Sequence, residues 1–546
     1  MRLRIGPTHN AAAEASRSAW MEAARFRAPA LDRSLTTDVV IVGSGICGTS
    51  LAYELTAKGV GVVMLDRGEI GRGMTARTSA HLTFQSDDLY QEVISRRGLR
   101  AAKLHYESQR AAVDRIEAIV KTEKIACDFR RLDGILGLIG EKPELLSKEI
   151  EACHSLGYTE VRWAKKAELR RLKASRGLCF PAQARFHPLK YLNGVLKIIA
   201  RRKGLIFGRS CVTEVTESER HVTVTTSAGY KVKARRAVIA TNSPIAPKVA
   251  IHTKQTPYRT YVIGAEIPKN KIVDALYWDT LDPYHYVRLQ PGRGKDMLIV
   301  GGEDHRTGEA DDAPRRFDKL ERWMRARFPE ARGIKYRWSG QILDPIDYTA
   351  FIGRCPGRKR LFLATGDSGQ GLTHGVVAGL LLADLTRGKT SPWADIYKPS
   401  RKTLDAAGRY VSDNMAVAKN MLGYLTPGDD AAAQRLKPGK GAVLRDGVAK
   451  LAVCRDSKGN LHVHSASCTH VGCLIRWNSF EQCWDCPCHG SHFAADGEAL
   501  NAPAISALAT AELPGHKAKA SSSGRGGLRQ RDEPHSRQPR SRRGAR

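Results

Sequence analysis

The sequence predicts a mixed α/β fold that is followed by a small all-β domain, and three observations support this prediction. A β-branched run at residues 39–42 leads into a glycine-rich loop and a helical stretch, which is the start of a βαβ unit. Strand-like segments at residues 221–226 and 284–289 predict a β-rich domain inserted after it. Short strand-like segments within residues 442–464 predict the final all-β domain.

The glycine-rich loop is followed by a helix and then by a second apolar run, residues 60–65, that ends on an acidic residue. Glycines in such a loop let the backbone approach a pyrophosphate, and the helix N-terminus favours its negative charge. The acid after the second strand can bind ribose hydroxyls. The alternative is a glycine-rich loop that occurs by chance. The strand before this loop, the helix after it and the acid beyond them argue against that alternative. We therefore expect a Rossmann-type dinucleotide site that includes Gly43, Ser44, Gly45, Ile46, Gly48, Asp66 and Arg67.

Three later segments indicate which dinucleotide is bound. Residues 71–83 resemble the flavin-contacting loop of the D-amino-acid oxidase-like family, the glycine/sarcosine oxidase group. Residues 237–242 resemble the strand and turn beside the nucleotide, although they end in Ala-Thr-Asn where many flavoproteins have Ala-Thr-Gly. Residues 361–375 resemble the C-terminal FAD motif and precede an apolar helix expected at residues 376–385. The resemblance spans about residues 17–400, and it implies FAD contacts from Thr75, Thr78, Ser79, Gly366, Gly369 and Gly371.

Two boxes of cysteine and histidine lie near the C-terminus, Cys468-Thr-His470-Val-Gly-Cys473 and Cys486-Pro-Cys488-His489-Gly-Ser491. Each box offers one thiolate and one imidazole, which is the ligand set of a Rieske [2Fe-2S] centre, with Cys468 and Cys486 on one iron and His470 and His489 on the other. A structural zinc site is the alternative, but zinc sites usually place the cysteines together and the histidines together. The boxes resemble those of Rieske proteins, and this resemblance implies a Cys473–Cys488 disulfide. Cys454 and Cys483 match no ligand position and are expected to be buried thiols.

The composition narrows the partners and the location. The formal net charge is +32, but the basic residues are spread along the chain apart from residues 516–546, which hold ten Lys/Arg against two Asp/Glu. We expect a solvated basic surface and no nucleic-acid partner. No apolar run is long enough to span a bilayer, and the N-terminus lacks an apolar signal core. We therefore expect no transmembrane segment and a cytoplasmic location, where burial would have to protect the implied disulfide.

These motifs predict the order of the domains. Residues 1–30 form an N-terminal extension in which Trp20-Met21 docks on the protein, and the sequence after Pro514 lacks the closing strands of the Rieske pattern. The flavoprotein module is expected at residues 31–400, with FAD-binding parts at about 36–90 and 335–390 and the substrate domain between them. A helical connector at 401–437 leads to the Rieske domain at 438–515, and a basic disordered tail follows at 516–546.

Together the parts predict an FAD-dependent oxidoreductase. FAD accepts two electrons and a [2Fe-2S] cluster carries one at a time, so electrons from the C–N bond of an amine or amino acid would leave through the cluster to a one-electron acceptor or oxygen. One alternative is a Rieske-linked flavin reductase driven by NAD(P)H, which needs a second strand-GxGxxG-helix unit that the sequence lacks. The other alternative is a non-catalytic redox sensor.

The sequence assigns no catalytic residue, although a few side chains are candidates for the site. A carboxylate-bearing substrate would require an arginine near the flavin, and Arg288 is the candidate; a surface arginine at a strand end is the alternative. His81 and His374 flank flavin motifs; each could contact the flavin ring, and the favoured alternative is a hydrogen-bonded structural histidine. His462 and His464 alternate on a strand and are expected at the surface.

Overall fold

The computed structural model describes residues 14–140, 143–245, 251–401, 420, 424, 428–429 and 433–513. The predicted basic tail at 516–546 and most of the predicted helical connector lie outside these residues. The fold below belongs to one compact unit that ends at Ala511. In the part of the chain that is described, no helix is both long enough and apolar enough to cross a bilayer.

The first sheet is mostly parallel. Among the described residues it has eight strands in the order β16-β17-β10-β1-β2-β7, and β9 and β8 extend it from β10. The β-branched residues of β1 suit a strand that is buried on both faces, and all of residues 39–42 are buried. Its strands are β1 Leu35–Val42, β2 Val62–Leu65, β7 Leu205–Phe207, β8 Val212–Glu217, β9 Val222–Thr226, β10 Lys231–Ile239, β16 Phe351–Arg354 and β17 Leu361–Thr365.

The carboxyl ends of the central strands meet at one edge of this sheet. Val42 pairs in parallel register with Leu65 on one side and with Ile239 on the other. The glycine-rich loop, Asp66 and the turn at residues 240–242 follow these three residues directly. In open α/β sheets this edge is where ligands bind. The register therefore brings together segments that are far apart in the sequence.

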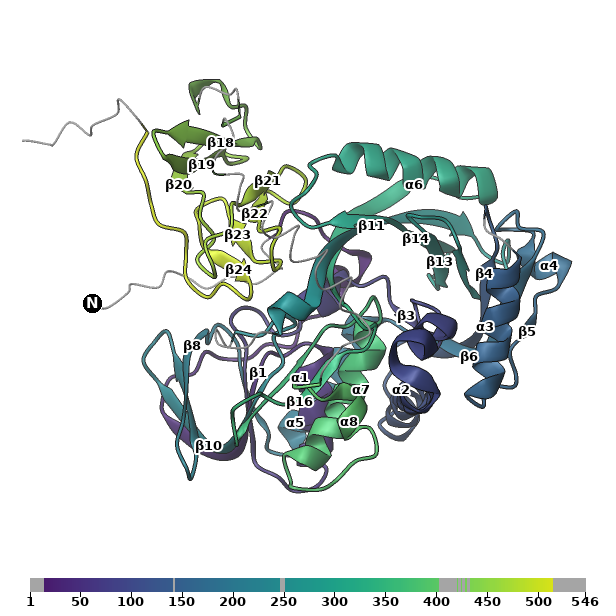
Figure 1. The fold of residues 1–546 in the computed structure, drawn as a ribbon, viewed down its shortest axis with the longest axis horizontal. Helices are drawn as coiled ribbons and strands as arrows, with labels where there is room; N and C mark the ends of the chain where they lie inside the picture. The colour runs from purple at the N-terminus through teal and green to yellow at the C-terminus, as the bar shows by residue number, and fades with distance from the viewer. Residues whose placement is uncertain are drawn as a thin grey trace, which may run out of the picture. The chain divides into compact units, whose positions relative to one another are not determined.

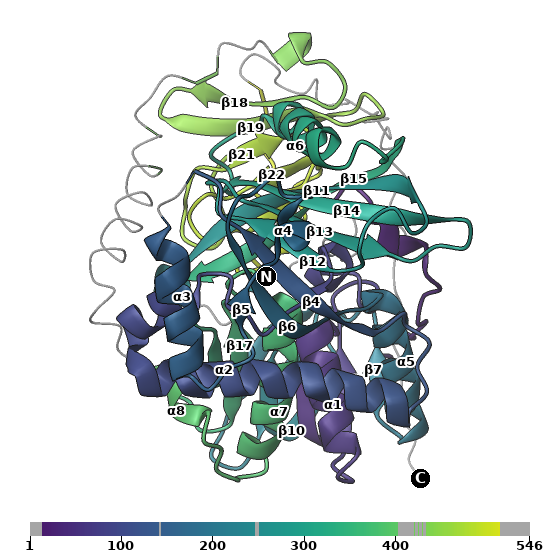
Figure 2. The same cartoon turned by 90° about the vertical axis from the view of Figure 1, so that its right-hand side faces the viewer.

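The helices cover this sheet and support the loops at its edge. Figure 2 shows α2 as a long helix that runs beside α1 and α7, and α2 is interrupted at Gly98. Gly379 of α7 lets the two central helices approach, because a Cβ there would lie 2.6 Å from the Cβ of Ser50 in α1. The helices are α1 Ile46–Thr56, α2 Tyr90–Thr122, α3 Glu144–Ser155, α4 Lys166–Leu169, α5 Pro188–Arg201, α6 Ala313–Arg327, α7 Gly371–Leu385 and α8 Ala394–Tyr397, with 3₁₀ turns η2 Ala19–Glu22, η3 Met74–Arg77, η4 His252–Lys254 and η7 Ala433–Arg435.

The second sheet is the inserted β-rich part, and α6 lies along one of its faces (Figure 1). In β13, alternate residues point to opposite faces. Val287 and Leu289 pack in the apolar cluster under α6, which leaves Tyr286 and Arg288 on the other face. Its strands are β3 His81–Leu82, β4 Arg130–Gly137, β5 Arg162–Trp163, β6 Gly177–Arg185, β11 Gln255–Pro268, β12 Leu276–Asp279, β13 His285–Gln290, β14 Lys295–Arg306 and β15 Ile334–Pro345.

Two small antiparallel sheets form the C-terminal part. The first has the order β18-β19-β20 and the second the order β21-β22-β23-β24. The predicted surface position of His464 is wrong, because this side chain is only 6% exposed and packs against Gly497. The strands are β18 Gly441–Asp446, β19 Ala449–Arg455, β20 Leu461–Ser465, β21 Arg476–Asn478, β22 Cys483–Asp485, β23 His492–Ala494 and β24 Ala499–Asn501.

The N-terminal segment packs on the rest of the chain from residue 14 onward. Trp20 and Met21 are buried, and the Trp20 Nε1–H donates to the carbonyl of Thr78 at 2.6 Å. The expected docking of this pair is therefore confirmed. Glu14 is buried as well, although nothing in its local sequence indicates this.

Candidate functional site

One cavity collects nearly all of the predicted dinucleotide-binding residues. Gly48 is the exception, and a Cβ at this position would lie 2.0 Å from the carbonyl oxygen of Gly43. This glycine therefore allows α1 to pack closely on the loop. The predicted residues that line the cavity are Gly43, Ser44, Gly45, Ile46, Asp66, Arg67, Thr75, Thr78, Ser79, Gly366, Gly369 and Gly371.

The glycine-rich loop is held by its neighbours in one conformation. Gly43 has φ of 108°, and a Cβ there would lie 2.3 Å from the carbonyl oxygen of Ala240, so only glycine fits. The Asp66 carboxylate accepts hydrogen bonds from the backbone N–H of Ser44 at 2.9 Å and from its hydroxyl at 2.6 Å. Asp66 therefore stabilises the glycine-rich loop by hydrogen bonds in addition to lining the cavity.

Asn242 explains the departure from the Ala-Thr-Gly pattern. Its φ is 64°, a left-handed conformation that asparagine adopts more readily than most residues with a side chain. The backbone of the turn can therefore keep the shape that glycine would give it. Thr241 and Asn242 both line the cavity.

The part of the cavity against the inserted sheet is lined by aromatic and acidic side chains. Trp278 of β12 and Tyr286 of β13 each lie over a glycine on the neighbouring strand. A Cβ at Gly134 would come within 2.5 Å of the Trp278 ring, and a Cβ at Gly301 within 2.2 Å of the Tyr286 ring. Tyr284, Asp87 and Asp304 complete this end. Sequence reasoning missed this group, and the alternation of Tyr284 and Tyr286 is the signal that could have found it.

Two of these acids are perturbed by their surroundings. The Tyr284 hydroxyl donates to Asp87 Oδ2 at 3.1 Å. Asp304 Oδ1 has no hydrogen-bond partner among the described residues, while a hydrogen bond of the same carboxyl with Thr260 opposes the rise of its pKa. Both carboxyls line the cavity; the Asp87 side chain is exposed and Asp304 is half-buried. Burial raises the pKa of Asp304 to about 7 and that of Asp87 to about 6, and neighbouring carboxyls add to both shifts.

Arg288 does not face the cavity. Its side chain is 0% exposed, and its N–H groups donate to the carbonyls of Ala80, Phe186 and Leu289 and to the Gln290 side chain. The alternation of β13 places it on the same face as Tyr286 but beyond the cavity lining. This geometry is at odds with both expectations for Arg288, because it is neither a substrate-facing arginine nor a surface arginine.

The two histidines beside the flavin motifs both line the cavity. His81 Nε2 lies 3.3 Å from the carbonyl of Val287, and His374 Nδ1 lies 2.9 Å from the carbonyl of Asp367. Burial lowers the pKa of His81 to about 3 and that of His374 to about 4, so both rings are neutral at pH 7. They are hydrogen-bonded histidines, as expected.

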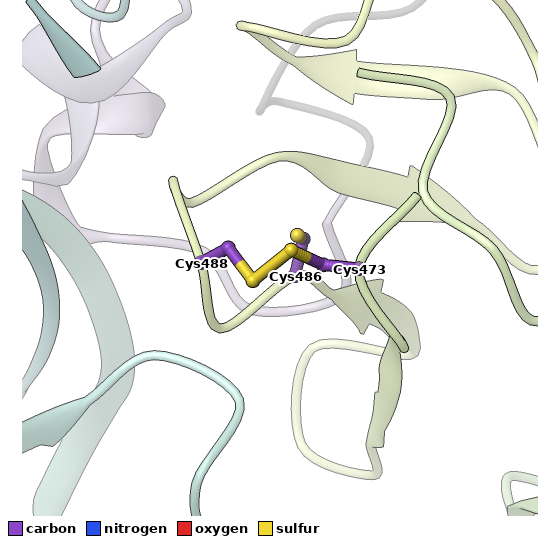
Figure 3. Close-up of side chains that lie close together, drawn as sticks. All are labelled: Cys473, Cys486 and Cys488. Atoms are coloured by element: carbon purple, nitrogen blue, oxygen red, sulfur yellow. A yellow bond between two sulfur atoms is a disulfide. The ribbon is translucent and has the colours of Figure 1, made fainter. Parts of the chain in front are cut away.

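The two cysteine–histidine boxes come together between the small C-terminal sheets. Cys473 and Cys488 form a disulfide, and Cys486 lies beside it (Figure 3). Both disulfide cysteines are almost fully buried, at 0% and 3% exposed. Interaction with the neighbouring thiol of Cys486 lowers the pKa of Cys468, although burial opposes this shift.

The histidines of the boxes also converge. The rings of His470 and His489 lie 5.0 Å apart. Among the described residues, Nδ1 of His470 and both ring nitrogens of His489 are buried without a hydrogen-bond partner. Buried nitrogens without a partner are costly, and a metal ligand is one way to satisfy them. The two predicted histidine ligands therefore lie together and have coordinating atoms without other partners.

A third imidazole lies against these histidines. His252 lies in η4, immediately before β11. Its ring centroid is 5.1 Å from that of His470 and 6.0 Å from that of His489. Its two ring nitrogens are buried and lack partners among the described residues. The sequence gave no reason to select it, because it stands alone in the chain far from both boxes.

The C-terminal part of the chain contributes to the cavity wall and contacts its neighbours. Leu500, Asn501 and Ala502, at and just after β24, line the cavity together with the glycine-rich loop. The side chain of Gln341 in β15 donates to the carbonyl of Gly490 at 3.1 Å, next to the second box. The Arg67 guanidinium donates to the carbonyl of Ala499 at 2.6 Å.

Buried charges join the same parts of the chain. Arg259 of β11 donates to Asp485 of β22 at 2.8 Å and lies 3.8 Å from Glu14. Arg77 lies 3.2 Å from Glu14 and 3.1 Å from Glu481, and all three side chains are 0% exposed. Although burial opposes ionisation, Arg77, Arg259 and His492 hold the pKa of Glu14 well below its usual range.

Fold and site together define a flavoprotein that is joined to an iron–sulfur domain. The chain matches the family of FAD dependent oxidoreductases over residues 38–385 and the Rieske [2Fe-2S] domain over residues 428–512. It therefore belongs to the FAD dependent oxidoreductase family and carries a C-terminal Rieske domain.

Individual proteins agree with this assignment. The chain is 32% identical to YhfW of Bacillus subtilis (strain 168), named as a Rieske 2Fe-2S iron-sulfur protein, over 89% of this chain and 95% of that one. It is 27% identical to gamma-glutamylputrescine oxidoreductase of Escherichia coli (strain K12), over 66% of this chain and 85% of that one. In fold it is similar to glycine oxidase from Geobacillus kaustophilus, with a TM-score of 0.58, 18% identity and coverage of 68% of this chain and 100% of the other.

The residues present fit both cofactors. The cavity at the carboxyl edge of the parallel sheet has the glycine backbone that a pyrophosphate requires, and the box histidines offer nitrogens without other partners. The protein is an oxidoreductase whose cofactors are FAD and a Rieske-type [2Fe-2S] cluster.

Proposed function

We propose that the protein oxidises the C–N bond of an amine or amino acid and delivers the electrons through its [2Fe-2S] cluster to an acceptor. The observation that carries this proposal is the shared cavity wall: Leu500, Asn501 and Ala502 of the Rieske part line the same cavity as the glycine-rich loop. A wall built by both parts would keep the two cofactors close at fixed stoichiometry, which favours transfer within one molecule.

When bound, FAD accepts the electron pair from the substrate and the cluster passes on single electrons. Under this proposal the chain supplies binding and orientation. FAD would be held by Gly43, Ser44, Gly45, Ile46, Asp66, Arg67, Thr75, Thr78, Ser79, Gly366, Gly369 and Gly371, with Gly48 shaping the loop. The cluster would be held by Cys468, His470, Cys486 and His489.

Other residues would exclude water and hold the two parts in place. The Gln341–Gly490 hydrogen bond and the Arg259–Asp485 ion pair fix the Rieske part on the flavoprotein part. His252 packs against both ligand histidines from the flavoprotein side and would keep their rings oriented. At the substrate end, Trp278, Tyr284 and Tyr286 would enclose a small molecule.

The choice of substrate class rests on the relatives. One relative is named gamma-glutamylputrescine oxidoreductase, and another, 24% identical over 391 residues, is a glycine oxidase of Bacillus licheniformis. Both names describe compounds in which a carbon beside nitrogen can be oxidised. We therefore extend an amine or amino-acid substrate to this chain.

The test is an anaerobic panel of amines and amino acids added to the purified holoprotein. A substrate should bleach the flavin absorbance first and then reduce the cluster, seen by electron paramagnetic resonance, at a rate independent of protein concentration. Cys486→Ala is the matched variant, because it should lose the cluster and keep flavin bleaching while transfer to a one-electron acceptor slows.

Two results would overturn the proposal in different ways. Bleaching by NADH or NADPH, with none by any amine, would favour a reductase that runs in the opposite direction. Equal turnover of the Cys486→Ala variant and the parent protein with the same one-electron acceptor would remove the cluster from the route.

We place the protein in the cytoplasm. Apart from the two cluster ligands Cys468 and Cys486, the described residues contain eight free cysteines beside a single disulfide, which suits a reducing compartment. The burial of Cys473 and Cys488 would protect their bond there. Cell fractionation with the periplasmic fraction as the control tests this location.

A further inference from the structure

The charge of the cavity lining distinguishes between the two substrate classes. Among the described residues that line it, the only arginines are Arg67 and Arg77, and lysine is absent. Arg77 is fully buried in contacts with Ser16, Ser339 and Glu481. Arg67 follows Asp66 and donates to the carbonyl of Ala499, so it belongs to the nucleotide end.

The end against the inserted sheet carries the opposite charge. Asp304 and Asp87 both face the cavity there, and Asp304 Oδ1 has no partner in the described part of the chain. His81, which also lines this end, is neutral because burial and Arg288 lower its pKa to about 3. An α-carboxylate placed here would meet two acids and no cation among the lining residues, so like-charge repulsion would oppose its binding.

The aromatic side chains of this end suit a cation. The rings of Tyr284 and Tyr286 lie 5.6 Å apart, and His81 packs edge-on against Tyr286 at 5.2 Å. Electron-rich faces of tyrosine and tryptophan attract organic cations. A protonated amine could therefore be held by a carboxylate on one side and by aromatic rings on the others.

We infer that the substrate is a cationic amine without a carboxylate on the carbon beside its nitrogen, and that Asp304 and Asp87 determine this specificity. Asp304 would accept a hydrogen bond from the bound ammonium, and Asp87, held by Tyr284, would add a second negative charge. This inference rests on the proposed function, because it assigns the substrate of the same cavity.

Two rigid probes of similar shape and opposite charge test the binding directly. Benzamidine is a cation and benzoate is an anion, and each is titrated into the oxidised holoprotein while the flavin spectrum is followed. We expect benzamidine to bind at least about tenfold more tightly than benzoate, and Asp304→Asn and Asp87→Asn each to weaken benzamidine about 10- to 100-fold. The exposed Asp318→Asn is the control and should leave both affinities unchanged.

Substrate oxidation provides the second readout. In the anaerobic panel, 1,4-diaminobutane and benzylamine should bleach the flavin at lower concentration than glycine, N-methylglycine or proline. Preference for the amino acids, tighter binding of benzoate, or unchanged affinity in both aspartate variants would overturn this inference and leave the proposed function standing. Absence of bleaching by either class would overturn the proposed function itself.

Discussion

The fully buried guanidinium of Arg259 offers the sharpest test of how the Rieske part is held on the flavoprotein part. Arg259 lies on β11 of the flavoprotein part, and its side chain is 0% exposed. It donates to Asp485 at 2.8 Å and to the hydroxyl of Ser339 at 2.9 Å, and it lies 3.2 Å from His492 Nε2. Burial opposes the charge, but Asp485 and Glu14 hold the pKa of Arg259 well above its usual value.

Arg259→Leu would leave Asp485 and Glu14 buried with much less positive charge beside them. Removing one partner of a buried ion pair costs about 3–5 kcal/mol, which corresponds to roughly 10²- to 10⁴-fold in an equilibrium constant. The pair spans β11 and β22, so the cost should weaken the contact that brings β24 to the cavity wall. We expect weaker FAD binding, a lower temperature of flavin release and slower reduction of the cluster.

The assay combines flavin fluorescence on heating with the anaerobic rate of cluster reduction. Arg293→Leu, at an exposed position in the β13–β14 turn, is the matched control. Adding Asp485→Asn to Arg259→Leu removes one stranded carboxylate and should recover part of the loss, by about 0.5–3 kcal/mol of coupling. If Arg259→Leu behaved like Arg293→Leu, or if Asp485→Asn added further damage, the proposed role of this ion pair would be refuted.

Three further predictions concern the cofactors and the substrate end. Gly45→Val should prevent FAD binding, because Gly45 lines the cavity at the start of α1. The control is Gly294→Ala, at a position with open space around it, and this variant should retain FAD, as measured by flavin absorbance. His470→Cys should lower the potential of the cluster or abolish it, since imidazole raises that potential, and an unchanged electron paramagnetic resonance spectrum would remove His470 from the ligand set. Benzamidine affinity should rise as pH increases from 5 to 8, because Asp87, with a pKa of about 6, and Asp304, with a pKa of about 7, become ionised over this range. Glu303 raises the pKa of Asp304, and Arg316 lowers it. A flat profile, or a slope that persists in the Asp87→Asn/Asp304→Asn double variant, would contradict this assignment.

The sequence alone was sufficient wherever the chemistry lies in consecutive residues. The strand, glycine loop and helix at residues 39–56 and the two cysteine–histidine boxes could be read directly, because the spacing of neighbouring residues constrains the local backbone. The strands at 441–465 were predicted for the same reason, and the helix expected at residues 376–385 begins earlier, at Gly371. Side-chain direction was harder to predict, as Arg288 and His464 illustrate, because burial depends on what packs opposite the strand.

The tertiary structure decided every feature that joins distant residues. Glu14 meets His492 across 478 positions of the chain, and His252 meets His470 through packing that no local pattern records. Asp87 comes from the loop before α2 and Asp304 from β14, and both line the same end of the cavity. Such encounters are determined by how sheets and helices pack, since the free energy of burying a charge depends on its partners in space and not on its neighbours in the sequence.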